Sequence, residues 1–309
     1  VDAGRLMTTA INNTIIGGFA GDAITTGSNN TALGYAALSG DIVGADNVAV
    51  GFGAMSSTDN ARANVAIGYN TLTTLDYSSL TYSHNVAIGF EAGKTITTGV
   101  ENTLIGGLAG DAITTGVRNT VVGYAALSQE DAHGTNVAIG YAALSVQNAG
   151  ADAFNTAVGY SSGIAVTTGA YNTLIGGLAG DALTTGEMNV AVGYGSLGSE
   201  DGNGKCVAIG MSALTSQNAG AEAYNVAVGY NAGYAVTTGD TNVLIGGLAG
   251  DALTTGSHNV AVGHEALTTE DAHGTNTAIG FRALKVQNAG ANAYNTAVGY
   301  SSGIAVTTA

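Results

Sequence analysis

The chain contains no proline, no tryptophan and only one cysteine, and charged residues make up only 9% of it. Without proline, the 49 glycines among 309 residues do not indicate a collagen-like triple helix, and 45% hydrophobic residues argue against a disordered chain. The one cysteine, Cys206, cannot form an internal disulfide. We interpret it as a small buried hydrophobic residue rather than a reactive thiol.

Basic residues are scarce as well, since seven Lys and Arg stand against 22 Asp and Glu and give a formal net charge of −15. This charge repels phosphate backbones and anionic lipid surfaces. We therefore expect no nucleic acid among the partners. No apolar run reaches the 18 residues that a membrane span requires, so we expect no membrane insertion in this segment.

One short phrase recurs throughout the chain: Asn, Val or Thr, a small or apolar residue, Val, Ile or Leu, and Gly. Twelve of the 16 steps between copies are 17 residues long, three are 19 and one is 21. A period this short indicates that each copy is one rung, which buries its apolar face only by stacking on its neighbours. The sequence predicts an all-β fold, an elongated parallel β-roll or β-helix solenoid of about 17 rungs. The rungs open at Asn13, Asn30, Asn47, Asn64, Asn85, Asn102, Asn119, Asn136, Asn155, Asn172, Asn189, Cys206, Asn225, Asn242, Asn259, Asn276 and Asn295.

A longer period of 70 residues is superimposed on the 17-residue period, because the steps from Asn85 onward run 17, 17, 17 and 19 and then repeat. We expect a single repeat domain over residues 1–309. It consists of a divergent five-rung N-terminal part (1–84) that begins at Asn13 and runs to the rung at Asn85, three four-rung modules (85–154, 155–224 and 225–294) and a truncated last rung (295–309).

Alternation along each rung separates two faces. Between Asn155 and Tyr160 it places Thr156, Val158 and Tyr160 on one face, and Ala157 and Gly159 on the other. We assign the third position after Asn, which is always Val, Ile or Leu, to the interior of the rung. The face of Ala or Leu and Gly would then permit the close approach of another chain.

Three kinds of residue are predicted to be scaffold. The opening Asn tolerates left-handed turn geometry and hydrogen-bonds nearby backbone, and its stacked copies would form an amide ladder. The Thr-Thr-Gly triplets indicate a second turn, in which Gly supplies a positive φ. Aromatic residues at the fifth position after Asn would stack as a structural ladder; the alternative is a strip that contacts glycans. The ladder residues are Asn85, Asn102, Asn119, Asn136 and Asn155 for the amides, and Tyr124, Tyr141, Tyr160, Tyr230 and Tyr300 for the rings.

The strings NVAIGY at Asn64, NVAIGF at Asn85, NTAIGF at Asn276 and NTAVGY at Asn295 resemble two related families of repeats. One is the β-roll head of trimeric autotransporter adhesins. The other, which is closer in spacing, is found in fibres of bacteriophages and bacterial surfaces, as in NTALGYAAL from Asn30. The resemblance covers nearly the whole chain and implies a homotrimeric, rigid rod that is extracellular or part of a virion.

The best candidate for site chemistry is EDAHGTN, which begins at Glu130 and recurs at Glu270. Its Asp131, His133, Asp271 and His273 are weak candidates for metal ligands. The intervening module reads SEDGNGKC and lacks the His and the Asn, so a solvated acidic turn is the favoured interpretation. No cofactor motif and no catalytic constellation stands out, and we expect a protein that is not an enzyme.

The function expected from these observations is a structural or adhesive fibre segment, used by a phage tail fibre or a bacterial surface adhesin to attach to a host or a surface. Its partners would be two further copies of the chain and a cell-surface glycan or protein receptor. Two alternatives remain: a subunit of a self-assembling extracellular filament, which uncapped solenoid ends would permit, and an ice-binding solenoid, which low charge and abundant Thr would suit.

Overall fold

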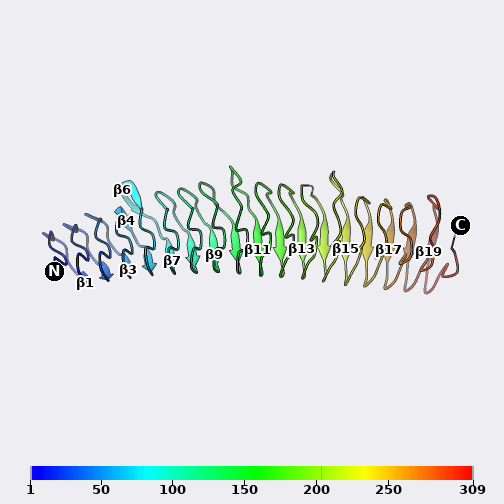
Figure 1. Cartoon of the computed structure of the whole chain (residues 1–309), viewed down its shortest axis with the longest axis horizontal. Helices are drawn as coiled ribbons and strands as arrows, with labels where there is room; N and C mark the ends of the chain where they lie inside the picture. Colours follow the sequence, from blue (N-terminus) through cyan, green and yellow to red (C-terminus); the bar gives the residue numbers. More distant parts are fainter. Residues whose placement is uncertain (1, 203, 308–309) are drawn as a thin grey trace. The chain divides into compact units, whose positions relative to one another are not determined.

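The computed structural model describes residues 2–202 and 204–307. In these residues the chain is an all-β parallel solenoid of about 17 turns, with one short strand in each turn and no helix. It divides into two compact units, Val1–Phe154 and Asn155–Ala309, which are built alike. Figure 1 shows the unit that runs from blue to green and the unit that runs from green to red.

Each turn contributes three residues of the type Val-Ala-Ile to the sheet, and the strand ends at the Gly that follows. In the first unit consecutive turns pair in parallel, with equivalent residues opposite one another, as Val48 pairs with Val65. The strands of this sheet are β1 (Thr14–Ile16), β2 (Thr31–Leu33), β3 (Val48–Val50), β5 (Val65–Ile67), β7 (Val86–Ile88), β8 (Thr103–Ile105), β9 (Thr120–Val122) and β10 (Val137–Ile139).

The second unit repeats this arrangement. Val190 pairs with Val207, and Val192 pairs with Ile209. Its strands are β11 (Thr156–Val158), β12 (Thr173–Ile175), β13 (Val190–Val192), β14 (Val207–Ile209), β15 (Val226–Val228), β16 (Val243–Ile245), β17 (Val260–Val262), β18 (Thr277–Ile279) and β19 (Thr296–Val298).

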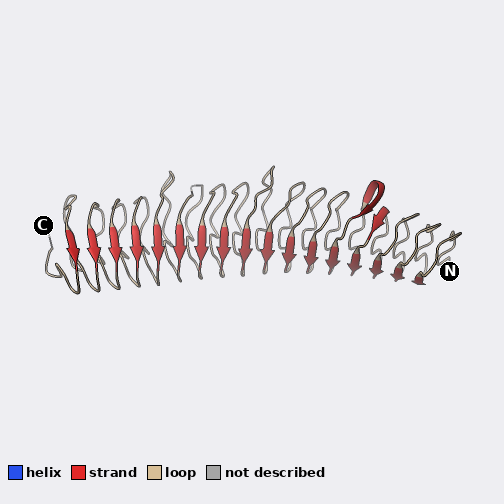
Figure 2. Ribbon diagram, turned by 180° about the vertical axis from the view of Figure 1, so that it is seen from behind, coloured by secondary structure: helices blue, strands red, loops and turns tan. Residues whose placement is uncertain are grey.

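A separate two-stranded parallel sheet joins the longest step of the repeat to the step before it, in the first unit. It is formed by β4 (Asp59–Arg62) and β6 (Asp76–Tyr82), and its register is irregular between Asp59 and Ala61. Figure 2 shows this pair standing away from the row of short strands. The four additional residues of the 21-residue step are therefore accommodated in a local projection, while the main sheet continues in register from β5 to β7.

The middle residue of each short strand points into the solenoid. In β11 Ala157 is fully buried, whereas Thr156 and Val158 on either side are only half-buried, and Leu174 is the buried residue of β12. The assignment of the third position, such as Val158, to the interior is therefore wrong. The face of Ala and Gly is the interior of the chain itself, where it packs against the loop of the same turn, and is not a contact with another chain.

The glycine that ends each strand is needed for close stacking. Gly159 has a φ of 143°, and a Cβ on it would lie 2.4 Å from the carbonyl oxygen of Gly176 in the next turn. The Thr-Thr-Gly glycines also stack closely, since a Cβ on Gly99 would lie 2.5 Å from the oxygen of Gly116. The expectation that these glycines supply a positive φ is wrong for Gly99, Gly116, Gly169, Gly239 and Gly256.

The residue before the opening Asn, rather than the Asn itself, is one of the left-handed residues of each turn. Glu101 and Arg118 have φ values of 60° and 58°, whereas the Asn residues that follow them have no positive φ. The opening Asn is buried, so its amide is committed to hydrogen bonds inside the solenoid. The prediction that Asn itself adopts left-handed geometry is wrong by one residue.

The double-glycine turns show how the core accommodates a larger inward residue. In β8 the inward residue is Leu104 where most turns have Ala, and it faces Gly110 of its own turn and Gly93 of the turn before, at a place where turns such as that of Leu127 have Leu. A Cβ on Gly110 would lie 3.0 Å from Leu104 Cδ2 and 2.7 Å from Ile113 Cδ1. The larger side chain in the strand is thus accommodated by a missing side chain in the loop.

Candidate functional site

The buried opening Asn residues form a hydrogen-bonded column in each unit, which Cys206 interrupts in the second. In the first unit the backbone N–H of Asn102 donates to Asn85 Oδ1 at 3.0 Å, and that of Asn119 donates to Asn102 Oδ1 at 2.9 Å. The Asn102 side-chain amide also donates to the Gly116 carbonyl at 2.8 Å. In the second unit the N–H of Asn172 donates to Asn155 Oδ1 at 2.8 Å. These amides satisfy buried backbone groups, which is a structural role.

Asn136 belongs to the same column, and its N–H donates to Asn119 Oδ1 at 3.1 Å. The five Asn residues named from the sequence are therefore all buried and all take part in hydrogen bonds of this type. Asn102, for example, accepts the N–H of Asn119 and donates to the Gly116 carbonyl, so its side chain links the end of one loop to the beginning of the next strand.

The aromatic residues at the fifth position lie on the surface and stack in runs. In the first unit Tyr35, Phe52, Tyr69 and Phe90 have ring centroids 5.2–5.4 Å apart with interplanar angles of 6–14°. Tyr124 and Tyr141 lie 5.9 Å apart. In the second unit Phe281 stacks on Tyr300 at 5.2 Å. The residues Tyr160 and Tyr230 are 61% and 54% exposed, so the aromatic residues form an outward row rather than a buried ladder.

Cys206 interrupts the amide column. Its N–H donates to Asn189 Oδ1 at 3.1 Å, but the thiol replaces the amide that would continue the column to Asn225. Burial raises the pKa of the Cys206 thiol to about 11, which keeps it protonated and unreactive at neutral pH. The thiol is fully buried, in agreement with the interpretation from the sequence.

Replacing Cys206 by Asn is expected to raise the free energy of unfolding by about 1 kcal/mol, because an amide oxygen would accept the Asn225 N–H that now faces a weakly accepting sulfur. Chemical unfolding of the wild type and the variant measures the difference. Cys206→Ala is the matched control, since it removes the sulfur without supplying any acceptor and should give no gain. A loss of stability in Cys206→Asn would show that the column does not have this energetic role.

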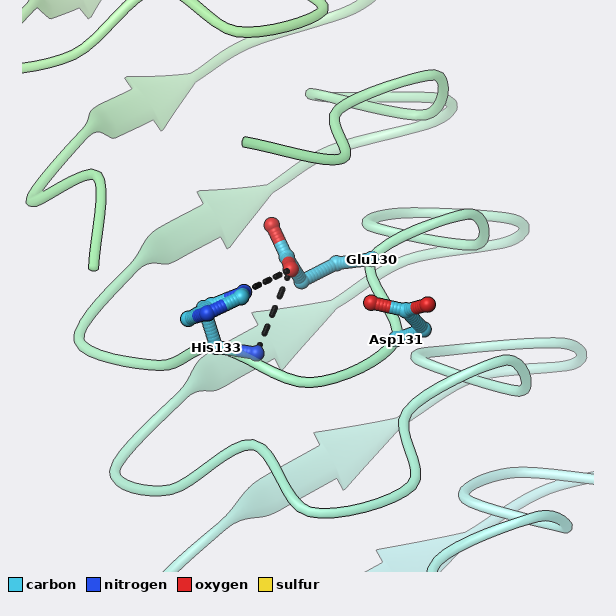
Figure 3. Close-up of side chains that lie close together, drawn as sticks. All are labelled: Glu130, Asp131 and His133. Carbon is cyan, nitrogen blue, oxygen red and sulfur yellow. Dashed lines mark hydrogen bonds and ion pairs between the residues drawn. The ribbon is translucent and has the colours of Figure 1, made fainter. Parts of the chain in front are cut away.

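Two identical groups of side chains lie in the loops that precede β10 and β18. Figure 3 shows the first, in which Glu130, Asp131 and His133 face one another across a single loop. His133 Nδ1 lies 3.7 Å from Glu130 Oε1, and the His133 backbone N–H donates to the same oxygen at 3.3 Å. Glu130 Oε2 accepts a hydrogen bond from Gln147 Nε2 at 3.1 Å. One ligand atom from each of the three side chains lies within 4.8 Å of the others.

The second group, in the second unit, consists of Glu270, Asp271 and His273 and has the same geometry. His273 Nδ1 lies 3.7 Å from Glu270 Oε1, and Gln287 Nε2 donates to Glu270 Oε2 at 3.2 Å. The structure thus brings together the Asp and His residues predicted from the sequence. It adds Glu130 and Glu270, which the sequence analysis did not single out as ligands.

Glu130 differs from its neighbours because it is fully buried, while Asp131 is exposed. Burial raises the pKa of Glu130, and the hydrogen bonds from Gln147 and the His133 backbone partly oppose this effect. Carboxylate and imidazole groups can ligate a divalent cation. However, both oxygens of Glu130 already accept hydrogen bonds from the protein. The geometry therefore also suits a buried acid that fixes the conformation of its own loop through these hydrogen bonds.

Replacing Glu130 by Ala is expected to cost about 2–4 kcal/mol of unfolding free energy, because Gln147 and the His133 N–H would be left without their acceptor in the core. Asp131→Ala in the same loop is the control and should change stability by less than about 0.5 kcal/mol. Thermal unfolding with and without added zinc checks both. If zinc raises the unfolding temperature of the wild type and of neither variant, the group is a metal site and this account of Glu130 fails.

The buried acids share one place in the turn. Asp41, Glu130, Glu200 and Glu270 all lie six residues before an opening position, where other turns have a buried aliphatic residue such as Ile113. Asp41 is fully buried, and one of its oxygens accepts the Gly44 N–H at 2.7 Å. Its other oxygen, Oδ2, has no hydrogen-bond partner. Burial is the main cause that raises the pKa of Asp41 to about 7, and the charge of Asp59 adds to it.

Comparison of the chain with family models, with curated proteins and with solved structures finds no match. Among the residues that the structure describes, no helix could cross a membrane.

Proposed function

We propose that this chain is a non-enzymatic segment of a homotrimeric fibre, as in a phage tail fibre or a bacterial surface adhesin, and that it serves in attachment to a host or a surface. Its place would be extracellular, on a cell surface or in a virion. The observation that supports the proposal is the chemistry of the outward face of the sheet in each unit.

This outward face is formed by the first and third residues after each opening position and by the aromatic row beside them. Across all the turns, none of these positions holds Asp, Glu, Lys or Arg, although the chain has 29 such residues elsewhere. The side chains remain accessible in the single chain: Ile175 is 39% exposed and Tyr194 is 58% exposed. The face is therefore a long apolar surface that no part of its own unit covers.

Parallel sheets are normally covered on both faces, and large apolar patches on a soluble protein mark contacts with other molecules. Here the loops of each turn cover only the inner face. A second copy of the chain suits the outer face, because its rungs have the same spacing and its face is equally free of charge. The resemblance to trimeric fibre repeats favours three copies.

The threonines of the Thr-Thr-Gly triplets argue against ice binding. Thr97, Thr167 and Thr237 donate their hydroxyls to backbone carbonyls of the next turn at 3.1–3.3 Å. Hydroxyl donors that are committed to the solenoid in this way are not available to an ordered water lattice. The same triplets are absent from many turns, so no continuous threonine face is formed.

The test is a charge placed on the outward face. Val192→Glu is expected to lower the mass in sedimentation velocity from that of a trimer to that of a monomer, because a carboxylate at the contact between chains would be desolvated without a partner. Ala291→Glu, in an exposed loop of the same unit, is the matched control and should leave the mass unchanged. If both variants sediment as the wild type does, the outward face is not the contact between chains.

A further inference from the structure

The residue before each opening position forms a second column on the surface. In all 17 turns this residue has a φ between 50° and 66°. Glycine adopts such a conformation without strain, and every other residue type pays conformational free energy for it. The chain contains 49 glycines, yet none of them stands in this column. Core residues such as Leu127 and Leu144 also have a positive φ, but their side chains are buried and fill the solenoid. In this column most of the side chains are exposed, which indicates that they serve contacts outside their own chain.

These side chains are also the most varied in an otherwise monotonous repeat. The column holds 11 different residue types, whereas the next position is Asn in 16 of 17 turns. Most members are exposed. We name this column the display column; its members are Asn12, Asn29, Asp46, Ala63, His84, Glu101, Arg118, Thr135, Phe154, Tyr171, Met188, Lys205, Tyr224, Thr241, His258, Thr275 and Tyr294.

In the second unit the display column borders a cavity of about 220 Å³. Met188 and Lys205 line it from consecutive turns, together with the carboxylates of Glu187 and Glu222. The loop that carries Glu222 and leads into β15 extends beyond its neighbours in Figure 1. The cavity is thus open at the surface and has both charge signs on its wall.

The ring of Tyr224 extends this group by one turn. Lys205 Nζ lies 5.5 Å from the centre of the Tyr224 ring and forms an ion pair with Glu222. The Tyr224 hydroxyl donates to the same carboxylate. Tyr224 is nevertheless 51% exposed, and Met188 beside the cavity is 49% exposed. An aromatic ring, a thioether, an ammonium group and two carboxylates are therefore presented together.

This combination is suited to a sugar. An apolar ring surface packs against the C–H face of a pyranose, while carboxylate acceptors and an ammonium donor bind its hydroxyls. The net charge of −15 disfavours a polyanion. We infer that the display column at Met188, Lys205 and Tyr224, with the adjoining cavity, binds a neutral saccharide unit of a surface glycan. The inference rests on the proposed attachment function and gives it a receptor class and a place.

Substitution by glycine distinguishes a binding role of these side chains from a structural one. Tyr224→Gly and Met188→Gly should each raise the unfolding temperature by about 2–4 °C, because glycine adopts the left-handed backbone of these positions without steric cost. Both should weaken glycan binding about tenfold or more, because the apolar platform is removed. Thr241→Gly is the matched control: it lies in the same column one turn beyond Tyr224, should gain the same stability and should keep the binding of the wild type.

The probe is a printed array of neutral hexose and N-acetylhexosamine oligosaccharides, and each protein is also measured by light scattering. Binding by the wild type that Tyr224→Gly loses and Thr241→Gly keeps supports the inference. A trimer that binds no neutral glycan overturns the inference and leaves the proposed fibre intact, whereas a monomeric wild type overturns the fibre itself. A fall in the unfolding temperature of Tyr224→Gly would assign its side chain a structural role and also overturn the inference.

Discussion

Replacing Gly263 by Ala is expected to lower the free energy of unfolding by about 4 kcal/mol or more, which is the range of the most damaging single substitutions. Gly263 ends β17 with a φ of 134°, and a Cβ on it would lie 2.4 Å from the carbonyl oxygen of Gly280. That oxygen belongs to backbone held in register by the next strand. Relief would require two turns of the solenoid to separate, with loss of their hydrogen bonds.

The matched control for this substitution is Gly290→Ala in an exposed loop of the same unit. A Cβ on Gly290 meets nothing within 4 Å, and this residue has no positive φ. Its replacement should leave stability unchanged or raise it slightly, because alanine restricts the unfolded chain. Thermal and urea unfolding followed by circular dichroism measure both variants. If the two variants were equally stable, the glycines that end the strands, such as Gly263 and Gly280, would not set the spacing between turns.

Asp41 is expected to make the first unit less stable as the pH rises. Its pKa of about 7 in the folded chain lies above the value of 3.8 for an unburied aspartate, so the folded state holds this proton more tightly than the unfolded state does. The contribution of the Asp41 proton to the free energy of unfolding is therefore fully present below pH 4, and it is lost as the pH rises from 4 to 7. A difference of about three pKa units corresponds to about 4 kcal/mol at most.

Replacement of Asp41 by Asn removes this titration and keeps an oxygen that can accept the Gly44 N–H. The variant should therefore be more stable than the wild type at pH 8 and close to it at pH 4. Asp131→Asn, at an exposed carboxylate, is the control and should follow the wild-type pH profile. Urea unfolding at pH 4, 6 and 8 gives the comparison. A wild type whose stability rises from pH 6 to pH 8 by the same amount as that of Asp41→Asn would contradict the role given to Asp41.

The spacing of the opening Asn predicted the solenoid, its parallel strands and its number of turns, because stacking in register needs the same residue types at the same interval. The faces were assigned the wrong way round. Alternation separates Thr156 and Val158 from Ala157 but does not show which side faces inward, and hydrophobicity favoured valine. The inward position of this narrow solenoid is Ala in most turns, and Val158, the residue that hydrophobicity favoured for the core, lies on the outer side.

The buried acids and the left-handed residues were missed for a different reason. Glu130 stands in a polar loop sequence that is typical of a solvated turn, and only alignment of the turns places it where Ile113 is buried in the preceding one. That alignment is the signal that would have found it. The display column gives no composition signal at all, because its members share only a backbone conformation. Its existence follows from the φ values of residues as different as Glu101 and Tyr224.

We propose that the outward face of Val, Ile, Thr and aromatic residues packs against other copies of the chain. Light scattering coupled to size-exclusion chromatography tests it most directly, over a range of protein concentrations. The account predicts one discrete species with three times the mass of a single chain. A monomer that stays soluble at every concentration would contradict the claim, and open-ended polymers would show that the chains associate through their ends instead.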